Sequence, residues 1–258
     1  MVRAMGLGKK IAVGVGGFFA VALAGVAITI AAVSEERPTG STGPEARALA
    51  DQMGKAVNLE AWKKIGAVEW TFAGRRSHLW DRTRSLTRMR QGDLEVWLDL
   101  STQKGIAKQA GQKLSGTALK EALESCYAAW VNDAFWLNPV GKMYDAGVDL
   151  SLVETKDAGK AVLASYTSGG LTPGDAYLWF PGEDGKPVRW KMWTSNIPVG
   201  GAESSWDGWI ELATGAWIST KHEMEAFTLE LTDVRGASTL VELSGEDVFE
   251  ELLQTSGT

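Results

Sequence analysis

The stretch WFPGEDGKPVRWKMW, residues 179–193, carries apolar side chains at alternating positions on both sides of a turn rich in Gly and Asp. In its second half, Trp190 and Met192 fall on one face, while Arg189 and Lys191 fall on the other. Successive side chains of a β-strand point to opposite faces of a sheet. The stretch therefore predicts a β-hairpin that presents a large apolar face.

The same period of two extends outward along the chain in both directions. In AVEWTFAGRR, residues 67–76, the side chains of Val68, Trp70 and Phe72 share one face. Further short runs of this kind follow up to residue 100, with Gly92 and Asp93 as a hairpin turn, and resume after residue 147. Short alternating strands separated by turn residues indicate an antiparallel meander.

Helical spacing is confined to a few places. PEARALADQMGKAVN, residues 44–58, and LEAWKKIGA, residues 59–67, predict two helices at the start of the domain. Residues 101–134 are rich in Ala, Lys and Gln and predict one or two helices interrupted around Gly116. Residues 246–258 predict a short terminal helix followed by a loose tail. The order predicts an α+β fold, with one large curved antiparallel sheet, an incomplete β-barrel, and helices that cap its concave face.

The composition disfavours nucleic-acid binding and is compatible with the binding of another ligand. The 258-residue chain has a net charge of −6, which provides no broad basic surface for phosphate backbones. Its 12 tryptophans are unusual, since each offers a large rigid apolar surface with one N–H group. Most are expected in the core of a β-rich domain, and the rest are available to a ligand.

The first 33 residues predict a membrane-targeting segment. An uncharged apolar run from Ile11 to Val33 follows three cations and is long enough to cross the roughly 30 Å hydrocarbon core as a helix. The preceding cations would stay in the cytoplasm, which puts the rest of the chain on the periplasmic side of the inner membrane. Cleavage of this segment as a signal sequence is the alternative. We expect a membrane anchor or signal sequence at 1–33, a flexible linker at 34–44, an exported domain at 45–250 and a loose tail at 251–258.

Residues suited to catalysis are few. The chain has two histidines, His78 and His222, and one cysteine, Cys126, and none of them lies in a recognisable catalytic or metal-binding motif. A cationic stretch, RRSHLWDRTRSLTRMR at residues 75–90, suits either contact with lipid phosphates or a solvated strand edge. We therefore expect no enzyme activity, no metal and no cofactor.

Four stretches resemble the LolA/LolB and LppX-like half-barrel superfamily, in particular an uncharacterised branch of outer-membrane lipoprotein-sorting-like proteins. They are LEAWKKIGAVEWTF, DAFWLNPVGKMYDAGVDLSLVE, GDAYLWFPGEDGKPVRWKMW and WDGWIELATGAWISTKHEM, within residues 55–225. Asp175, Tyr177, Arg189 and Trp190 stand where that branch has an acidic residue, Tyr and Arg-Trp. The Asp-Pro-x-Thr-Gly turn of that branch is replaced by residues 181–186, and its lipobox or simple cleavable signal by the long apolar run.

The resemblance implies an apolar cavity between a curved sheet and its helical cover, which would hold a lipid, an acyl chain or another hydrophobic ligand. Lipid or lipoprotein trafficking, an inner-membrane tether and a cell-envelope protein partner are the corresponding expectations. The candidate lining consists of aromatic and large apolar residues on the predicted inner face: Trp70, Phe72, Trp80, Leu98, Trp136, Trp179, Trp190 and Met192.

Two other functions are open at this point. A carbohydrate- or envelope-binding module would use exposed tryptophans as a stacking platform, for which the candidates are Trp97, Trp193, Trp206 and Trp209. A hydrolase would need a nucleophile and a base, and the sequence shows no such pair.

Overall fold

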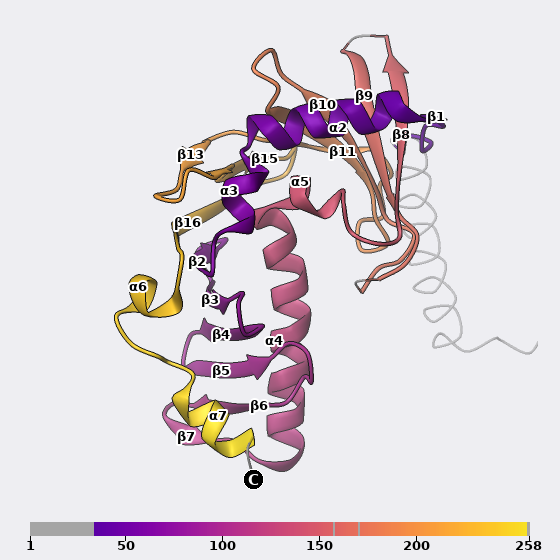
Figure 1. Cartoon of the computed structure of the whole chain (residues 1–258). Helices are drawn as coiled ribbons and strands as arrows, with labels where there is room; N and C mark the ends of the chain where they lie inside the picture. The colour runs from indigo at the N-terminus through magenta and orange to yellow at the C-terminus, as the bar shows by residue number, and fades with distance from the viewer. Residues whose placement is uncertain (1–33, 157, 170, 257–258) are drawn as a thin grey trace, which may run out of the picture.

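The computed structural model describes residues 34–156, 158–169 and 171–256 (Figure 1). The predicted membrane segment at 1–33 lies outside the described residues. Among the residues that are described, no helix combines the length and apolar character needed to cross a bilayer.

Two large antiparallel sheets dominate the fold. The first has eight strands in the order β15-β16-β2-β3-β4-β5-β6-β7. Their bounds are β2 (Ala67–Phe72), β3 (Arg76–Asp81), β4 (Leu86–Gln91), β5 (Leu94–Asp99), β6 (Gly105–Gln109), β7 (Gln112–Lys113), β15 (Lys221–Glu223) and β16 (Thr228–Ala237). The second has six strands in the order β1-β8-β9-β10-β11-β12. Their bounds are β1 (Ser41–Thr42), β8 (Val148–Thr155), β9 (Gly159–Tyr166), β10 (Ala176–Pro181), β11 (Pro187–Trp193) and β12 (Ala202–Ser205). A small pair, β13 (Ile210–Glu211) and β14 (Trp217–Ile218), stands apart.

The α+β class and the unclosed antiparallel arrangement are confirmed, but the predicted single sheet is divided in two. The two sheets approach each other at β12 and β15, where Asp207 forms an isolated bridge with Lys221. There the Glu223 backbone N–H donates to Ser205 Oγ at 2.9 Å. Because a side-chain oxygen takes the place of a backbone carbonyl, the hydrogen-bond ladder is interrupted between these strands.

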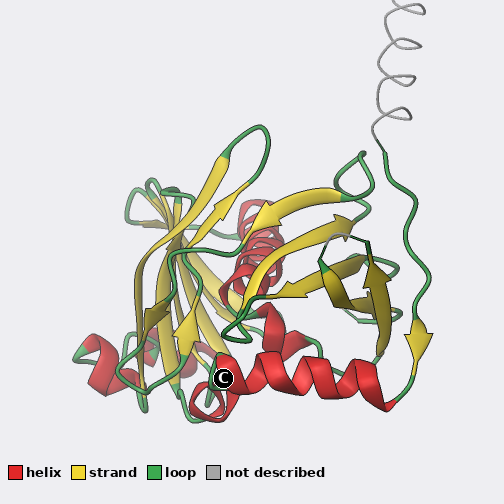
Figure 2. Ribbon diagram, turned by 90° about the horizontal axis from the view of Figure 1, so that it is seen from above, coloured by secondary structure: helices red, strands yellow, loops and turns green. Residues whose placement is uncertain are grey.

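The described helices are α2 (Pro44–Ala56), α3 (Leu59–Lys63), α4 (Gly116–Leu137), α5 (Pro139–Lys142), α6 (Leu240–Ser244) and α7 (Glu250–Ser256). Pro44 stands at the first turn of α2, where its missing N–H costs nothing. Asn58 caps α3, since its side-chain oxygen accepts from the Ala61 backbone N–H at 3.2 Å. Figure 2 views α4 along its axis between the strands of the two sheets, with α2 crossing the second sheet.

The hairpin predicted from the opening stretch is confirmed. Trp179 of β10 faces Trp190 of β11, and the turn closes where the Gly182 N–H donates to the Lys186 carbonyl at 2.7 Å. Gly185 has a φ of 81°, a left-handed conformation that glycine adopts without strain. Trp190 and Met192 are both buried, as the predicted apolar face requires.

Residues 101–115 differ from the sequence prediction. We expected helix there, but β6 and β7 occupy 105–113, and α4 begins at Gly116. The turn between these strands is made by Ala110 and Gly111, with φ of 49° and 78°. Two consecutive positive φ values are typical of a tight hairpin turn and incompatible with a right-handed helix.

The main hydrophobic core lies between the two sheets and α2 to α5. A second cluster fills the space between the first sheet and the C-terminal helices, where Phe249 and Leu252 are buried. The residues from 251 onward, predicted as a loose tail, thus belong largely to α7 as far as Ser256.

The segment 34–44, predicted as a flexible linker, makes contacts along the second sheet. The Glu35 carboxylate accepts from Lys191 Nζ at 2.7 Å, and its carbonyl accepts from Trp193 Nε1 at 2.8 Å. The Arg37 guanidinium hydrogen-bonds the Ser165 hydroxyl, and β1 pairs with the edge strand β8. These contacts cross from β11 to the opposite edge of the sheet.

Candidate functional site

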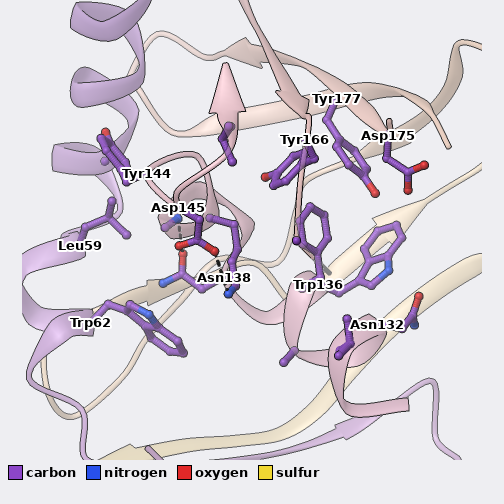
Figure 3. A pocket seen from close by; sticks show the side chains of 18 of the residues that line it. Leu59, Trp62, Asn132, Trp136, Asn138, Tyr144, Asp145, Tyr166, Asp175 and Tyr177 are labelled. Atoms are coloured by element: carbon purple, nitrogen blue, oxygen red, sulfur yellow. Dashed lines mark hydrogen bonds and ion pairs between the residues drawn. The ribbon is translucent and has the colours of Figure 1, made fainter. Parts of the chain in front are cut away.

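A cavity of about 1090 Å³ lies among α2, α3, the C-terminal part of α4, α5 and the second sheet (Figure 3). The loops at 168–172 and 194–197 complete its wall. Gly54 and Leu59 line it from the helices and Met192 from β11. It therefore occupies part of the space between helices and sheet where the resemblance implies a hydrophobic site.

One wall of the cavity is an aromatic cluster. The ring of Phe135 lies 4.9 Å from that of Tyr177 and 5.6 Å from that of Tyr166 between centroids. Trp190 packs behind them, 4.6 Å from Tyr177, and Trp136 lies 4.9 Å from Trp190. Rings at such distances form a rigid apolar surface.

Two tyrosine hydroxyls of this wall stay neutral. Burial raises the pKa of Tyr166 well above its ordinary value, and burial together with the nearby Asp175 raises that of Tyr177. The Tyr166 hydroxyl is buried and has no hydrogen-bond partner among the described residues, and the same holds for Thr194 Oγ1. Both residues line the cavity.

Near α2 the cavity wall is polar and its charges are paired. The Tyr144 hydroxyl donates to Asp51 Oδ1 at 3.0 Å, and the Arg47 guanidinium lies 4.4 Å from the centre of the Tyr144 ring. Burial and this hydrogen bond raise the pKa of Tyr144. At α5, Asn138 accepts from the Gly141 N–H at 3.0 Å and so caps the short helix.

Arg82 forms the wall beside α3. Its Nη1 donates to the backbone carbonyls of Trp62 at 2.5 Å and Ile65 at 2.8 Å. The guanidinium lies 4.4 Å from the Trp62 ring centre and 5.3 Å from that of Trp80. Trp80 in turn meets Trp130 edge-on at 5.1 Å. Burial lowers the pKa of Arg82, but a guanidinium remains charged in a protein.

Comparison with known proteins finds likeness in fold only. No family model matches the chain, and no curated protein matches it. Among solved structures, it is similar to a DUF1329 family protein from Desulfovibrio piger, with a TM-score of 0.38 and 12% identity over 78% of this chain and 97% of the other. It is also similar to a domain from Vibrio parahaemolyticus described as an outer membrane lipoprotein-sorting protein domain. There the TM-score is 0.31 and the identity 6%, over 78% of this chain and 97% of the other.

The predicted lining residues are divided between the cavity and the core. Trp80, Trp136 and Met192 line the cavity. The other five are buried in packed clusters: Trp70, Phe72, Leu98, Trp179 and Trp190. Trp70 stacks on His78 with 4.7 Å between ring centres. Leu98 packs in a separate cluster with Cys126 on the first part of α4.

Several lining residues were missed from the sequence, including Trp62, Trp130, Tyr166 and Tyr177. Their signal was present in part, because Tyr177 lies in the stretch that resembles the half-barrel family. Trp62 and Trp130 sit on helices whose placement over the sheet no local pattern specifies.

The two histidines lie apart from the cavity in buried positions. His78 Nε2 hydrogen-bonds Asp133 Oδ2 at 2.7 Å, and Asp133 also accepts from Arg76 Nε and Nη2, each at 2.7 Å. Burial raises the pKa of Asp133, but the hydrogen bonds from His78 and Arg76 outweigh it and hold the pKa below its usual value. Within the described part of the chain, no group of His, Cys, Asp and Glu is arranged to hold a metal ion. Burial raises the pKa of the Cys126 thiol to about 12, which keeps it protonated.

The tryptophans considered for a carbohydrate platform do not form one exposed surface. Trp206 is 2% exposed and Trp97 is 9% exposed, and they belong to different hydrophobic clusters. Trp193 and Trp209 are only partly buried. Trp209 packs against the main core, whereas Trp193 packs on the cluster at the other face of the second sheet.

Proposed function

We propose that this protein binds a hydrophobic ligand, such as a lipid or an acyl chain, in the cavity between its helices and the second sheet, and that it holds the ligand without converting it. The observation that carries the proposal is a space of about 1090 Å³ with an aromatic cluster, which includes Phe135, Tyr166 and Tyr177, along one wall. Pockets for small molecules commonly span about 300–1,000 Å³ and are mostly apolar. This cavity is slightly larger than that range.

The energetics favour an acyl chain as occupant. Burial of each methylene contributes about 0.8 kcal/mol, so ten methylenes contribute roughly 8 kcal/mol before the costs of association. The rings of Phe135, Tyr166 and Tyr177 contact one another, so the wall is largely ordered before a ligand arrives. A wall of this kind supplies affinity without ionic contacts.

The proposed location is the periplasmic side of the inner membrane, with the domain tethered through residues 1–33 or released after their cleavage. The apolar run from Ile11 to Val33 supports this location. In this setting the domain would take part in lipid or lipoprotein trafficking, with an envelope protein as partner.

Titration of the delipidated full-length chain with cis-parinaric acid, a fluorescent fatty acid, tests the proposal. We expect saturable energy transfer from tryptophan to one bound probe molecule per chain. Val131→Trp, which adds a large side chain at the cavity wall, should weaken binding by about ten-fold or more, because it removes space that the ligand fills.

Val188→Trp is the matched control, since Val188 is 45% exposed on β11 and does not line the cavity. It should bind like the wild type. The proposal fails if the wild type shows no saturable binding, or if the two variants bind equally well.

A further inference from the structure

We propose that the ligand of this cavity carries an anionic headgroup, a carboxylate or a phosphate, that binds the Arg82 guanidinium. This inference rests on the proposed function and adds the chemical class of the ligand. It places the charged end of an amphiphile at α3 and β3, with the apolar chain directed to the aromatic wall of Phe135 and Tyr177.

Arg82 differs from four of the arginines near it in the sequence. Arg76 pairs with Asp133 at 2.7 Å and Arg84 pairs with Asp81 at 2.6 Å. Arg88 and Arg90 both approach Glu95, at 3.8 Å and 2.6 Å. Arg82 is partly buried, yet it makes no ion pair with any described residue. A buried cation without a counter-charge is costly, so its retention at a cavity wall points to a charge supplied from outside.

The geometry leaves the binding edge of this guanidinium without a partner. Two backbone carbonyls occupy Nη1, and two tryptophan rings pack against the group, so its orientation is fixed. Nε is buried and has no acceptor among the described residues. The side-chain hydrogen bonds of Arg82 to described residues are the two from Nη1, so Nη2 has no acceptor there either. Arg76 uses this same pair of atoms, Nε and Nη2, to grip both oxygens of Asp133. The Nε and Nη2 N–H groups of Arg82 are therefore arranged to donate to two oxygens of one carboxylate or phosphate.

Two further donors on the same wall lack acceptors. Trp80 Nε1 and Trp130 Nε1 are buried and have no hydrogen-bond partner in the described part of the chain, and both residues line the cavity, as Arg82 does. Tryptophan N–H groups only donate, as does a guanidinium. A headgroup with two or more oxygens matches this donor-rich wall, whereas a neutral hydrocarbon end leaves its N–H groups unpaired.

The carboxylates that line the cavity do not supply this charge, because each already has a partner. Asp51 accepts from Tyr144 and pairs with Arg47, and Glu60 pairs with Lys63 at 2.7 Å. The remaining two are also engaged: Asp145 pairs with Lys142 at 3.1 Å, and Asp175 accepts from the Ser195 N–H at 2.9 Å.

The test compares cis-parinaric acid with its methyl ester, which has the same chain and no charge, on the full-length protein at pH 8. Hydrogen bonds to charged groups are stronger than those between neutral groups, so the wild type should prefer the acid by about ten-fold or more. Arg82→Met should lose this preference and bind the ester with unchanged affinity. Arg88→Met, which removes a half-buried arginine that does not line the cavity, should keep it.

Competition with lysophosphatidic acid and with the matched monoacylglycerol distinguishes a phosphate headgroup from a carboxylate, since only an anionic competitor should gain from Arg82. If Arg82→Met does not fold, Arg82→Lys is the second variant. It keeps the positive charge but lacks the paired Nε and Nη2 donors, so it should show a reduced preference for the acid. Equal affinity of the wild type for acid and ester, or an unchanged preference in Arg82→Met or Arg82→Lys, would overturn the inference and leave the proposed function intact. Binding of neither probe would instead overturn the proposed function.

Discussion

Replacement of Asp133 by Asn should destabilise the fold by about 3 kcal/mol or more, at the lower end of what breaking a buried ion pair costs. The Asp133 carboxylate is fully buried and accepts from Arg76, His78 and Asn132 at 2.7–2.9 Å. Asn keeps the shape of the side chain but removes the charge and turns an N–H group toward these donors. The lower end of the range applies because a histidine ring nitrogen can accept from the new amide.

Urea unfolding, followed by tryptophan fluorescence and by far-UV circular dichroism, measures this effect. With a urea m-value of about 3 kcal/mol/M, a loss of 3 kcal/mol moves the midpoint by about 1 M. Asp145→Asn is the control, since it removes a carboxylate whose ion pair with Lys142 is exposed and contributes at most about 1 kcal/mol. Equal midpoints for the Asp133→Asn and Asp145→Asn variants would refute the argument.

The pH dependence of the same variant provides a second measurement. The folded-state pKa of Asp133 lies below its usual value, as described above. A depressed carboxyl pKa adds stability above the unfolded value of about 3.9, and this stability is lost as the pH falls through the folded value. The wild type should therefore lose stability below about pH 4, and Asp133→Asn should lose less over the same range.

Three further predictions concern other buried sites. Burial lowers the pKa of His222 to about 4, so the unfolded state binds a proton first and stability falls between pH 6.5 and 4. In His222→Phe the urea midpoint should change less with pH over that range. The nearby Asp207 favours the charged form of His222 slightly and so reduces the effect of burial. Gly105→Ala should lower the free energy of unfolding by about 1–3 kcal/mol, because the added Cβ would lie 2.2 Å from a backbone carbonyl, whereas Gly141→Ala, with its nearest contact at 3.3 Å, should have a much smaller effect in the same urea assay. Tyr166→Phe removes a buried hydroxyl that has no partner among residues 34–156, 158–169 and 171–256, so the melting temperature should stay the same or rise. A fall of several degrees would contradict this account.

The elements that the sequence predicts well are those with a local cause. Alternation of apolar residues predicts β2 and the hairpin of β10 and β11. Trp70 and Trp190, which lie on the predicted apolar faces of these elements, are buried. Pro44 and Asn58 stand at the starts of α2 and α3. The first backbone N–H groups of a helix have no acceptor within the helix, and proline lacks this group while the asparagine side chain accepts from it. Signals of this kind depend on neighbouring residues alone.

The elements that the sequence misses depend on distant contacts. Residues 105–113 have helix-favouring Ala, Lys and Gln, yet β6 pairs with β5 along its whole length. Gly105 fits there because a Cβ at this position would lie 2.2 Å from the Trp97 carbonyl oxygen, so a side chain would collide with it. Tertiary pairing overrides a weak local preference, which is the usual limit of propensity. The division into two sheets has the same origin, since it is decided where β12 meets β15.

The position of the cavity is of this non-local kind as well. Sequence patterns place aromatic residues on inner faces, but they do not distinguish rings that fill the core from rings that border a space. That distinction is decided by how far α4 reaches between the sheets. The helix is fixed to the first sheet through Asp133, and two and three residues later Phe135 and Trp136 pack against Trp190 of the second sheet. An ion pair at one sheet therefore sets how deeply the helix fills the gap at the other, and the space left over is the cavity.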